Sequence, residues 1–425
     1  MRLTVSIVVL FVLSAMAEPS RAGVNYEEEP IRYSEAQADD AVSRLQADLD
    51  SGKMSLKRSG ETGYLEAILD ALQVSKVSQT LVFSKTSLQA DKIGPRQPRA
   101  IYFNDEVHVG YVRGGLVELA AADPLLGMVF YTFDPDDSPP RFERQRNRCL
   151  NCHASSRTGN VPGVLVRSVF PDPKGQPVIA AGSFVTSPRS PLEQRWGGWY
   201  VTGESGDQKH LGNFQLPDSR KPKEISNTSG QNVLDLADRC EIGHYLAPSS
   251  DIVALMVLEH QTAFYNALTR ATFLTRLRDW TREKKELDMS LPPIQAELDA
   301  ATESLVQQIL FSDEAKLASP IRGTSSFAAD FPGTGPRTAA GLSLKELDLQ
   351  TRVFRHPCCY LILARPFQRT PSSLRMAIYR KLGAILSSPE QPAGFTHLTT
   401  ESRGTLRAVL TELVPEFAIA TAPEN

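Results

Sequence analysis

The pattern of hydrophobic and polar positions divides the chain into helical ends and a central region of strands. Apolar residues recur at helical spacing over 38–49 and 65–72, and Ser34 with Gln37 matches a capping box before the first helix. From residue 80 the period shortens, and β-branched and aromatic residues dominate short runs. These runs predict an antiparallel meander followed by a hairpin. The predicted strands cover residues 81–83, 100–103, 107–111, 127–131, 164–170 and 178–181.

The second half of the chain is predominantly helical by the same criterion. Residues 252–258 are hydrophobic all round, so we expect a buried helix to begin at Asp251. Residues 319–341 are rich in Gly, Pro, Ser and Thr and predict a long loop. The remaining predicted elements are a helix over 294–311, a short buried element over 360–363, and helices from Ser372 and from Glu401.

These elements predict an α+β fold in which antiparallel strands pack with N-terminal and C-terminal helices. A chain of 425 residues has room for two or three domains, and one large unit over residues 18–425 is the alternative. The segments that we expect are residues 1–17, an N-terminal helical segment over 18–79, a mixed β region over 80–217, a helical region over 218–320, and a loop with C-terminal helices over 321–425.

The first 17 residues match a secretory signal peptide. Arg2 precedes an apolar run over residues 3–16, and small residues close it at Ala17. A membrane anchor is the alternative, but a bilayer span needs about 20 apolar residues. We therefore expect cleavage, a periplasmic or secreted protein, and no transmembrane segment after cleavage.

The stretch Cys149-Leu150-Asn151-Cys152-His153 has the C-x-x-C-H spacing that attaches a c-type haem. Two thiols separated by two residues can add to the two vinyl groups of the macrocycle, and the imidazole of His153 reaches the iron. A redox dithiol, half of a zinc site and a short-range disulfide are the alternatives. The trailing histidine and the predicted export favour haem, because haem c is attached outside the cytoplasm. The sequence therefore predicts one covalent haem c.

The other three cysteines do not form a second motif of this kind. Cys358 and Cys359 are adjacent rather than spaced to chelate a zinc ion together with the first pair. One disulfide between Cys240 and either of them is possible in an oxidising compartment.

Residues 195–203 form the densest aromatic stretch and contain two of the three tryptophans. Trp199 can wall a macrocycle and Arg195 can bind a haem propionate, whereas an ordinary aromatic core strand is the alternative. The arginines between 144 and 148 can pair with propionates or with an acidic partner, or they can form a solvated loop.

A second axial ligand opposite His153 would decide how the iron functions. His260 is the first candidate, because an imidazole within an apolar helix needs a partner, and a core histidine with a protein partner is the alternative. His210 is the second candidate because it closely follows the aromatic stretch. Met256, one turn before His260, is the third.

The chain resembles a group of bacterial exported proteins with a cytochrome c domain and unsettled function. In the compact all-helical cytochromes c the motif ends an N-terminal helix, whereas here it lies between predicted strands, so we do not expect that fold. The resemblance implies covalent haem and export, and it implies no substrate. The segments that carry it are residues 98–105, 148–156, 195–203, 210–213, 254–261 and 354–358.

The leading expectation is a periplasmic monohaem cytochrome that passes single electrons to a redox protein in the cell envelope. An open-site haem oxidoreductase for peroxide or a small nitrogen or sulfur compound, a haem-based sensor, and an exported binding module without haem are the alternatives. In an open site, Arg195 and Tyr200 would be candidate distal groups. The 46 basic and 49 acidic residues create no overall field for nucleic acid, so we expect no nucleic-acid partner.

Overall fold

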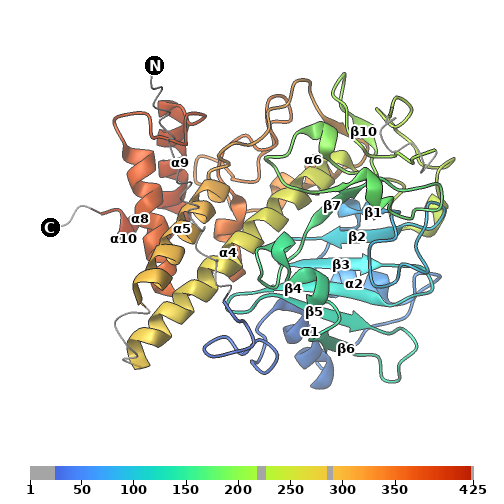
Figure 1. Cartoon of the computed structure of the whole chain (residues 1–425), viewed down its shortest axis with the longest axis horizontal. Coiled ribbons are helices and arrows are strands. Elements are labelled where there is room, and N and C mark those ends of the chain that lie inside the picture. The colour runs from blue at the N-terminus through green and yellow to red at the C-terminus, as the bar shows by residue number, and fades with distance from the viewer. Residues whose placement is uncertain (1–23, 218–225, 285–290, 423–425) are drawn as a thin grey trace, which may run out of the picture.

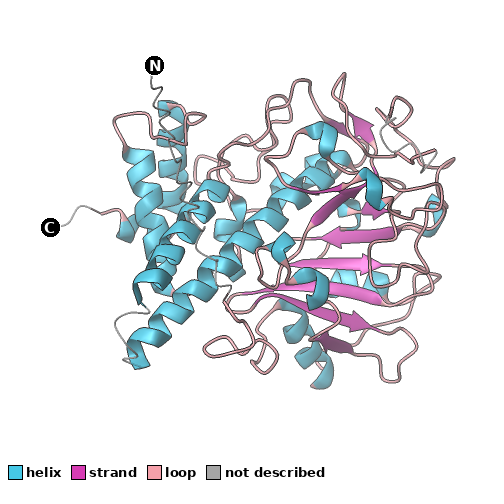
Figure 2. Cartoon of the chain, in the orientation of Figure 1, coloured by secondary structure: helices cyan, strands magenta, loops and turns pink. Residues whose placement is uncertain are grey.

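The computed structural model describes residues 24–217, 226–284 and 291–422. The strands form antiparallel sheets, and the longer C-terminal helices lie beside them, which confirms the predicted α+β class (Figure 2). The predicted signal peptide over residues 1–17 lies outside the described residues.

A seven-stranded antiparallel sheet forms the centre of the fold, in the order β6-β5-β4-β3-β2-β1-β9. Strands β1 to β6 are neighbours in chain order, so the predicted meander is confirmed, with β4 and β6 as strands that the pattern did not predict. The last position is taken by β9, which pairs with β1. The strands are β1 (Thr80–Val82), β2 (Arg99–Phe103), β3 (Val107–Tyr111), β4 (Val117–Asp123), β5 (Gly127–Phe133), β6 (Phe142–Gln145) and β9 (Trp199–Tyr200).

Two small antiparallel ribbons accompany the sheet. Strands β7 (Val166–Val169) and β8 (Ser183–Thr186) form a hairpin, and β10 (Gly203–Glu204) pairs with β11 (Arg322–Gly323). The prediction of a second hairpin strand over residues 178–181 was wrong in position. Ile179–Ala181 instead forms a 3₁₀ turn, and the pairing begins after Gly182, whose φ of +90° suits glycine.

The N-terminal helices α1 (Ala41–Asp50) and α2 (Leu65–Ala71) confirm the two predicted helices. The first begins later than Ser34, because the carboxylate of Asp40 accepts hydrogen bonds from the backbone N–H groups of Val42 and Ser43. An aspartate with this geometry satisfies two of the free N–H groups of the first turn. The predicted cap at Ser34 was therefore wrong.

Helix α4 (Ile252–Lys284) is the longest element, and its first turns are buried as predicted. It runs from the sheet toward a group of helices at the C-terminal side of the molecule (Figure 1). No helix in residues 24–217, 226–284 and 291–422 combines the length and apolarity needed to cross a bilayer. The other helices are α3 (Leu150–His153), α5 (Leu291–Ile309), α6 (Phe327–Asp330), α7 (Arg365–Gln368), α8 (Ser372–Ser387), α9 (Thr400–Leu413) and α10 (Pro415–Ala420).

One hydrophobic cluster extends from Ile31 to Phe417 and includes buried side chains from every predicted segment of the described chain. A smaller cluster around Phe170, Leu211 and Phe214 lies under the β7–β8 hairpin. Burial of apolar surface of this kind contributes about 25 cal/mol per Å².

The register of the sheet places an arginine, a glutamate and two aromatic side chains on one face. Val82 of β1 lies opposite Arg99 on one side and Trp199 on the other. Ile101, two positions after Arg99, lies opposite Gly110 of β3, which lies opposite Glu118 of β4. Phe130 of β5 lies opposite Ala120, two positions after Glu118. Because side chains alternate between faces, Arg99, Glu118, Phe130 and Trp199 share one face.

Candidate functional site

The C-x-x-C-H motif forms a single helical turn between β6 and β7. Cys149 is the N-cap residue of α3, and the backbone N–H of His153 donates to the Cys149 carbonyl at 2.9 Å. Positions separated by three and four residues lie on one side of a helix. The turn therefore brings the thiols of Cys149 and Cys152 and the imidazole of His153 to one side.

The imidazole of His153 is held by one backbone hydrogen bond and one ring contact. Its Nδ1 lies 2.9 Å from the carbonyl oxygen of Gly163, and its ring centroid lies 4.8 Å from that of Phe130. Because a carbonyl only accepts, Nδ1 carries the proton and the neutral ring keeps its lone pair on Nε2. Burial lowers the pKa of His153, which favours that neutral form. This arrangement suits an imidazole that ligates a metal through Nε2.

Both cysteines of the motif are free thiols. Cys152 is exposed and Cys149 is half-buried, and burial raises the pKa of Cys149 to about 11. Thiols in redox-active C-x-x-C motifs have a lowered pKa instead. The structure therefore gives no support to a redox dithiol at this position.

Arginines surround the motif. Arg99 forms an ion pair with Glu118 at 2.7 Å, and the charges of both residues act on Cys149 and His153. Arg167 of β7 lies near Cys152. The Nε atoms of Arg99 and Arg167 are buried without a hydrogen-bond partner. An unpaired buried N–H of this kind is costly, so both guanidinium groups are available to an added acceptor.

The residues around the motif have the chemistry that a covalently bound haem would require. Two free thiols lie beside an imidazole with a free Nε2, and two arginines with unpaired N–H groups lie near them. Carboxylates such as the haem propionates are the usual bidentate partners of arginine. Cys149 and Cys152 would hold the macrocycle, His153 would ligate the iron, and Arg99 and Arg167 are the candidate propionate contacts.

The structure gives Arg195 a different environment from the one expected. Its guanidinium is buried and forms an ion pair with Glu259 at 2.8 Å, and it also donates to the carbonyl oxygens of Pro188 and Ser190. Thr186 donates to the same carboxylate at 2.6 Å. Because protein acceptors occupy its nitrogen atoms, we do not assign Arg195 to a haem propionate.

Trp199 lies on the same face of the sheet as Arg99 and is almost fully buried. Its indole N–H donates to the backbone carbonyl of Arg167 at 2.8 Å. Trp199 therefore supports the strand that carries Arg167, and its role as a wall for the macrocycle stays a prediction.

His260, the first candidate for the second axial ligand, is engaged inside the helical part of the fold. Its Nε2 lies 3.0 Å from the Glu314 carboxylate, and its ring packs edge-on against Phe311 and Phe354. None of these contacts is shared with His153. Because Nε2 donates to a carboxylate, the lone pair of a neutral ring lies on Nδ1, and the role of His260 as an iron ligand stays a prediction.

His210 is engaged as well. Its Nδ1 accepts a hydrogen bond from the backbone N–H of Gly212 at 3.0 Å, and its ring packs edge-on against Trp196. Burial lowers the pKa of His210 to about 4, so the ring is neutral and carries its proton on Nε2. Neither nitrogen offers a free lone pair. Met256 is buried in the first turns of α4.

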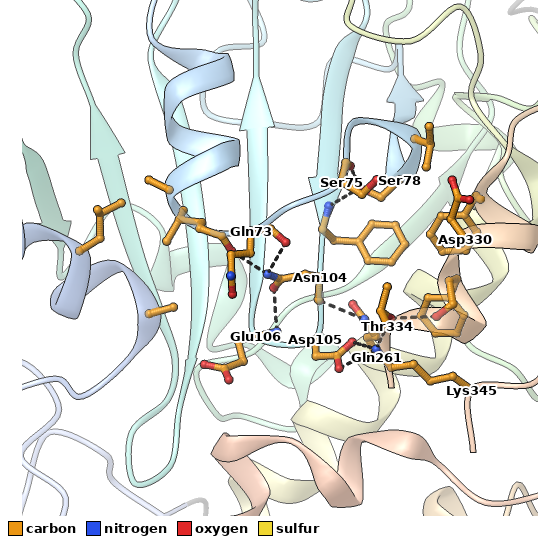
Figure 3. Close-up of a pocket in the computed structure, with 18 of the residues that line it drawn as sticks. Gln73, Ser75, Ser78, Asn104, Asp105, Glu106, Gln261, Asp330, Thr334 and Lys345 are labelled. Atoms are coloured by element: carbon orange, nitrogen blue, oxygen red, sulfur yellow. Dashed lines mark hydrogen bonds and ion pairs between the residues drawn. The ribbon is translucent and has the colours of Figure 1, made fainter. Parts of the chain in front are cut away.

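A cavity of about 620 Å³ lies apart from the motif, between the β2–β3 turn, helices α1 and α2, and the loop around residue 334 (Figure 3). Its most buried charge is Lys345, whose Nζ lies 2.8 Å from Asp105 and 2.8 Å from Thr334. Asn104 and Gln261 are likewise bonded to protein groups. Since these groups satisfy one another, the cavity presents few free donors or acceptors for a ligand.

Sequence reasoning missed Gly163, Phe130, Arg99 and Arg167 as neighbours of the motif. Arg99 and Phe130 belong to strands that the pattern predicted, but only the strand pairing shows that they face the same side of the sheet as one another. Gly163 follows the motif by ten residues and has no side chain to mark its role.

No protein-family model, curated protein or solved structure matches this chain. The described residues also contain no group of three or more His, Cys, Asp or Glu side chains arranged to hold a metal ion by themselves. The resemblance to exported cytochrome-c-domain proteins therefore stays an expectation from the sequence.

Proposed function

We propose that this protein is a periplasmic monohaem c-type cytochrome that transfers single electrons. The observation that carries the proposal is the geometry of His153, whose Nδ1 donates to the Gly163 carbonyl while Nε2 stays free beside two free thiols. A bound haem c supplies an iron that cycles between the ferric and ferrous states. The protein's own part is to hold that group, to orient the imidazole and to set the surrounding charge.

The motif is exposed, which supports electron transfer to another protein rather than catalysis in an enclosed site. Cys152 is exposed and the neighbouring Arg148 and Arg157 are exposed as well, so the attachment edge lies at the protein surface. Weak redox complexes form over small interfaces, and charged rims speed their formation. A surface edge among cationic side chains suits contact with a second protein.

A second candidate function follows from the engagement of His260 and His210. Both imidazoles are hydrogen-bonded to other protein groups, His260 to Glu314 and His210 to Gly212. This favours an iron whose sixth position accepts an exchangeable ligand, as in a haem oxidoreductase or a haem-based sensor.

Visible spectra of the exported protein, produced in a host that matures c-type cytochromes, test these proposals. We expect a haem spectrum that survives denaturation, and its loss in Cys149→Ala/Cys152→Ala. Cys240→Ala, at a free buried cysteine outside the motif, is the matched control and should keep the haem. A ferrous spectrum unmoved by carbon monoxide supports electron transfer, whereas ready binding supports the second candidate. A colourless wild-type protein would overturn both.

A further inference from the structure

The cavity at the β2–β3 turn is bordered by one side of a short helical segment. Helix α6 continues through residues 331–334 as a 3₁₀ turn. Four of its residues line the cavity at a spacing of three and four, and they are Phe327, Asp330, Phe331 and Thr334. Side chains at this spacing lie on one side of a helix. Figure 3 shows Asp330 and Thr334 on the same side of the cavity, so this segment presents two phenyl rings and one carboxylate to it.

The phenyl rings form an apolar wall of the cavity. Phe327 and Phe331 are stacked with their centroids 5.2 Å apart, and the ring of Phe103 lies 5.8 Å from that of Phe327. The Nζ of Lys345 lies 4.9 Å from the centroid of the Phe331 ring. The face of an aromatic ring attracts an ammonium group within about 6 Å. This wall can therefore pack against the apolar part of a ligand and also accept a positive charge beside it.

Carboxylates outnumber cationic groups in the described lining of the cavity. Lys345 is paired with Asp105 at 2.8 Å, and Arg44 is paired with Glu106 at 3.1 Å. These two ion pairs use both cationic groups of the lining, whose charged residues are Arg44, Asp48, Asp105, Glu106, Asp330 and Lys345. The two other carboxylates give the cavity an excess of negative charge, which attracts cations.

Asp330 is the carboxylate that a ligand can use. Asp48 has Lys53 as a partner at 3.2 Å, outside the lining. Asp330 is exposed and accepts a hydrogen bond from the Ser326 hydroxyl at 2.6 Å, and it forms no ion pair with any other residue that the structure describes. A carboxylate has two oxygen atoms and about four acceptor sites. Asp330 can therefore accept from an ammonium group without losing its bond to Ser326.

We propose that this cavity is the binding site for a small organic cation, an amine that carries an apolar body. Its volume of about 620 Å³ is in the range of small-molecule sites. The apolar body would pack against Phe103, Phe327 and Phe331, and the ammonium group would donate to Asp330. Hydrogen bonds between ionised groups are about twice as strong as neutral ones. None of the lining residues belongs to the C-x-x-C-H motif, so this proposal does not depend on haem.

Isothermal titration calorimetry of the exported protein with tryptamine tests the proposal. Tryptamine joins an aromatic body to an alkylamine, which is cationic at pH 7. Indole-3-propionate has nearly the same shape and carries a carboxylate instead, so it is the matched control compound. We expect tryptamine to bind with a dissociation constant below about 1 mM, and indole-3-propionate to bind at least tenfold more weakly. Equal affinity for the two compounds, or no binding of tryptamine, would overturn the proposal.

Asp330→Asn removes the charge and keeps the shape of the side chain. It should weaken tryptamine binding at least tenfold, because a neutral amide is a weaker acceptor for an ammonium group. Asp299→Asn is the matched control, since Asp299 is also exposed, accepts a side-chain hydrogen bond from Gln295, and lies outside the lining. It should change the affinity less than twofold. Equal affinities of the two variants for tryptamine would overturn the proposal.

Asp330→Lys separates a contact with the ligand from an effect on folding. A cationic group at this position should repel tryptamine and attract indole-3-propionate, so the preference between the two compounds should reverse. A variant that is only less stable would lose affinity for both compounds alike. Asp299→Lys should keep the wild-type preference. If Asp330→Lys still prefers the amine, the proposal is wrong.

Discussion

The Nδ1 atom of His153 lies 2.9 Å from the carbonyl oxygen of Gly163. Helix α4 fixes the segment that provides this carbonyl, since the Asn266 side chain accepts from the backbone N–H of Val164 at 3.0 Å and donates to the carbonyl of Val164 at 2.8 Å. The orientation of the imidazole therefore depends on a helical residue that lies 102 positions after Val164 in the sequence. Outer-shell contacts of this kind fix the tautomer and ring orientation of a ligating histidine and raise its basicity.

Gly163→Ala should disturb this arrangement. A Cβ atom at this position would lie 2.2 Å from Oδ1 of Asn266 and 3.2 Å from the side chain of Thr158. The added methyl group forces Asn266 or the loop to move, at an expected cost of about 1–3 kcal/mol in the free energy of unfolding. Chemical denaturation measures the loss, and the haem-loaded protein should bind carbon monoxide more readily than the wild type.

Gly243→Ala is the control for this substitution, because a Cβ at Gly243 meets no atom within 4 Å and its φ is not positive. It should leave both readouts within error of the wild type. If Gly163→Ala also leaves both unchanged, the Gly163 carbonyl does not position His153.

Breaking the buried ion pair of Arg195 and Glu259 should lower the free energy of unfolding and leave haem attachment unchanged. Glu259→Gln leaves the Arg195 guanidinium buried without its counter-charge, which should cost about 3–5 kcal/mol in the free energy of unfolding. Glu297→Gln removes a half-exposed partner of Arg270 and should cost no more than about 1 kcal/mol. Folded Glu259→Gln protein should keep its haem, and haem loss without loss of stability would place Arg195 at the cofactor after all.

Two buried histidines predict how stability depends on pH. Burial lowers the pKa of His108 and of His210 to about 4 from an ordinary value of 6.5. As the pH falls from 6.5 to 4, the unfolded chain binds protons that the folded chain does not, so the free energy of unfolding should fall by about 1.4 kcal/mol per pH unit for each histidine. Above pH 7 both rings are neutral in both states and contribute no slope.

Substitution tests the assignment of this slope. His108→Gln and His210→Gln should each give a shallower fall than the wild type when unfolding is measured by denaturant at pH 4.5 and pH 7.5. A slope that neither substitution changes would mean that other groups control acid stability.

Substitution of Arg167 should change the midpoint potential of the haem. Arg167 lies near Cys152 and has an unpaired buried Nε. A positive charge beside the haem favours the ferrous state, so Arg167→Gln should lower the midpoint potential, by an energy on the order of 1 kcal/mol. Redox titration measures the shift, and Arg322→Gln, at an exposed arginine, provides the control. A potential that does not move would remove Arg167 from the site.

Local sequence pattern predicted the elements whose burial follows a clear period. The strands of the meander and helix α4 have such patterns, and the structure confirms them. It did not predict β4 or β6, because β4 reads Val-Glu-Leu-Ala-Ala-Ala-Asp, with three alanines of low β propensity, and β6 reads Phe-Glu-Arg-Gln. These strands form because neighbouring strands, β3 and β5 for β4 and β5 for β6, supply hydrogen bonds and packing that the local pattern does not contain.

The partners of the candidate site residues could not be predicted from the local sequence pattern either, because they lie far away in the sequence. The sequence indicated that His260 needs a partner, and the structure supplies Glu314, which is 54 residues away. Arg195 likewise finds Glu259 at a separation of 64 residues. Only the folded arrangement of α4 against its neighbours brings these charges together, so the sequence named the motif and left its surroundings open.

The intact mass of the exported protein tests the central claim most directly. The protein is produced with the haem-attachment machinery of its host, denatured and analysed beside Cys149→Ala/Cys152→Ala. We predict a wild-type mass equal to that of the polypeptide plus one haem, and a variant mass without it. A wild-type mass equal to that of the polypeptide alone, in a host that loads a known c-type cytochrome in parallel, would contradict the account.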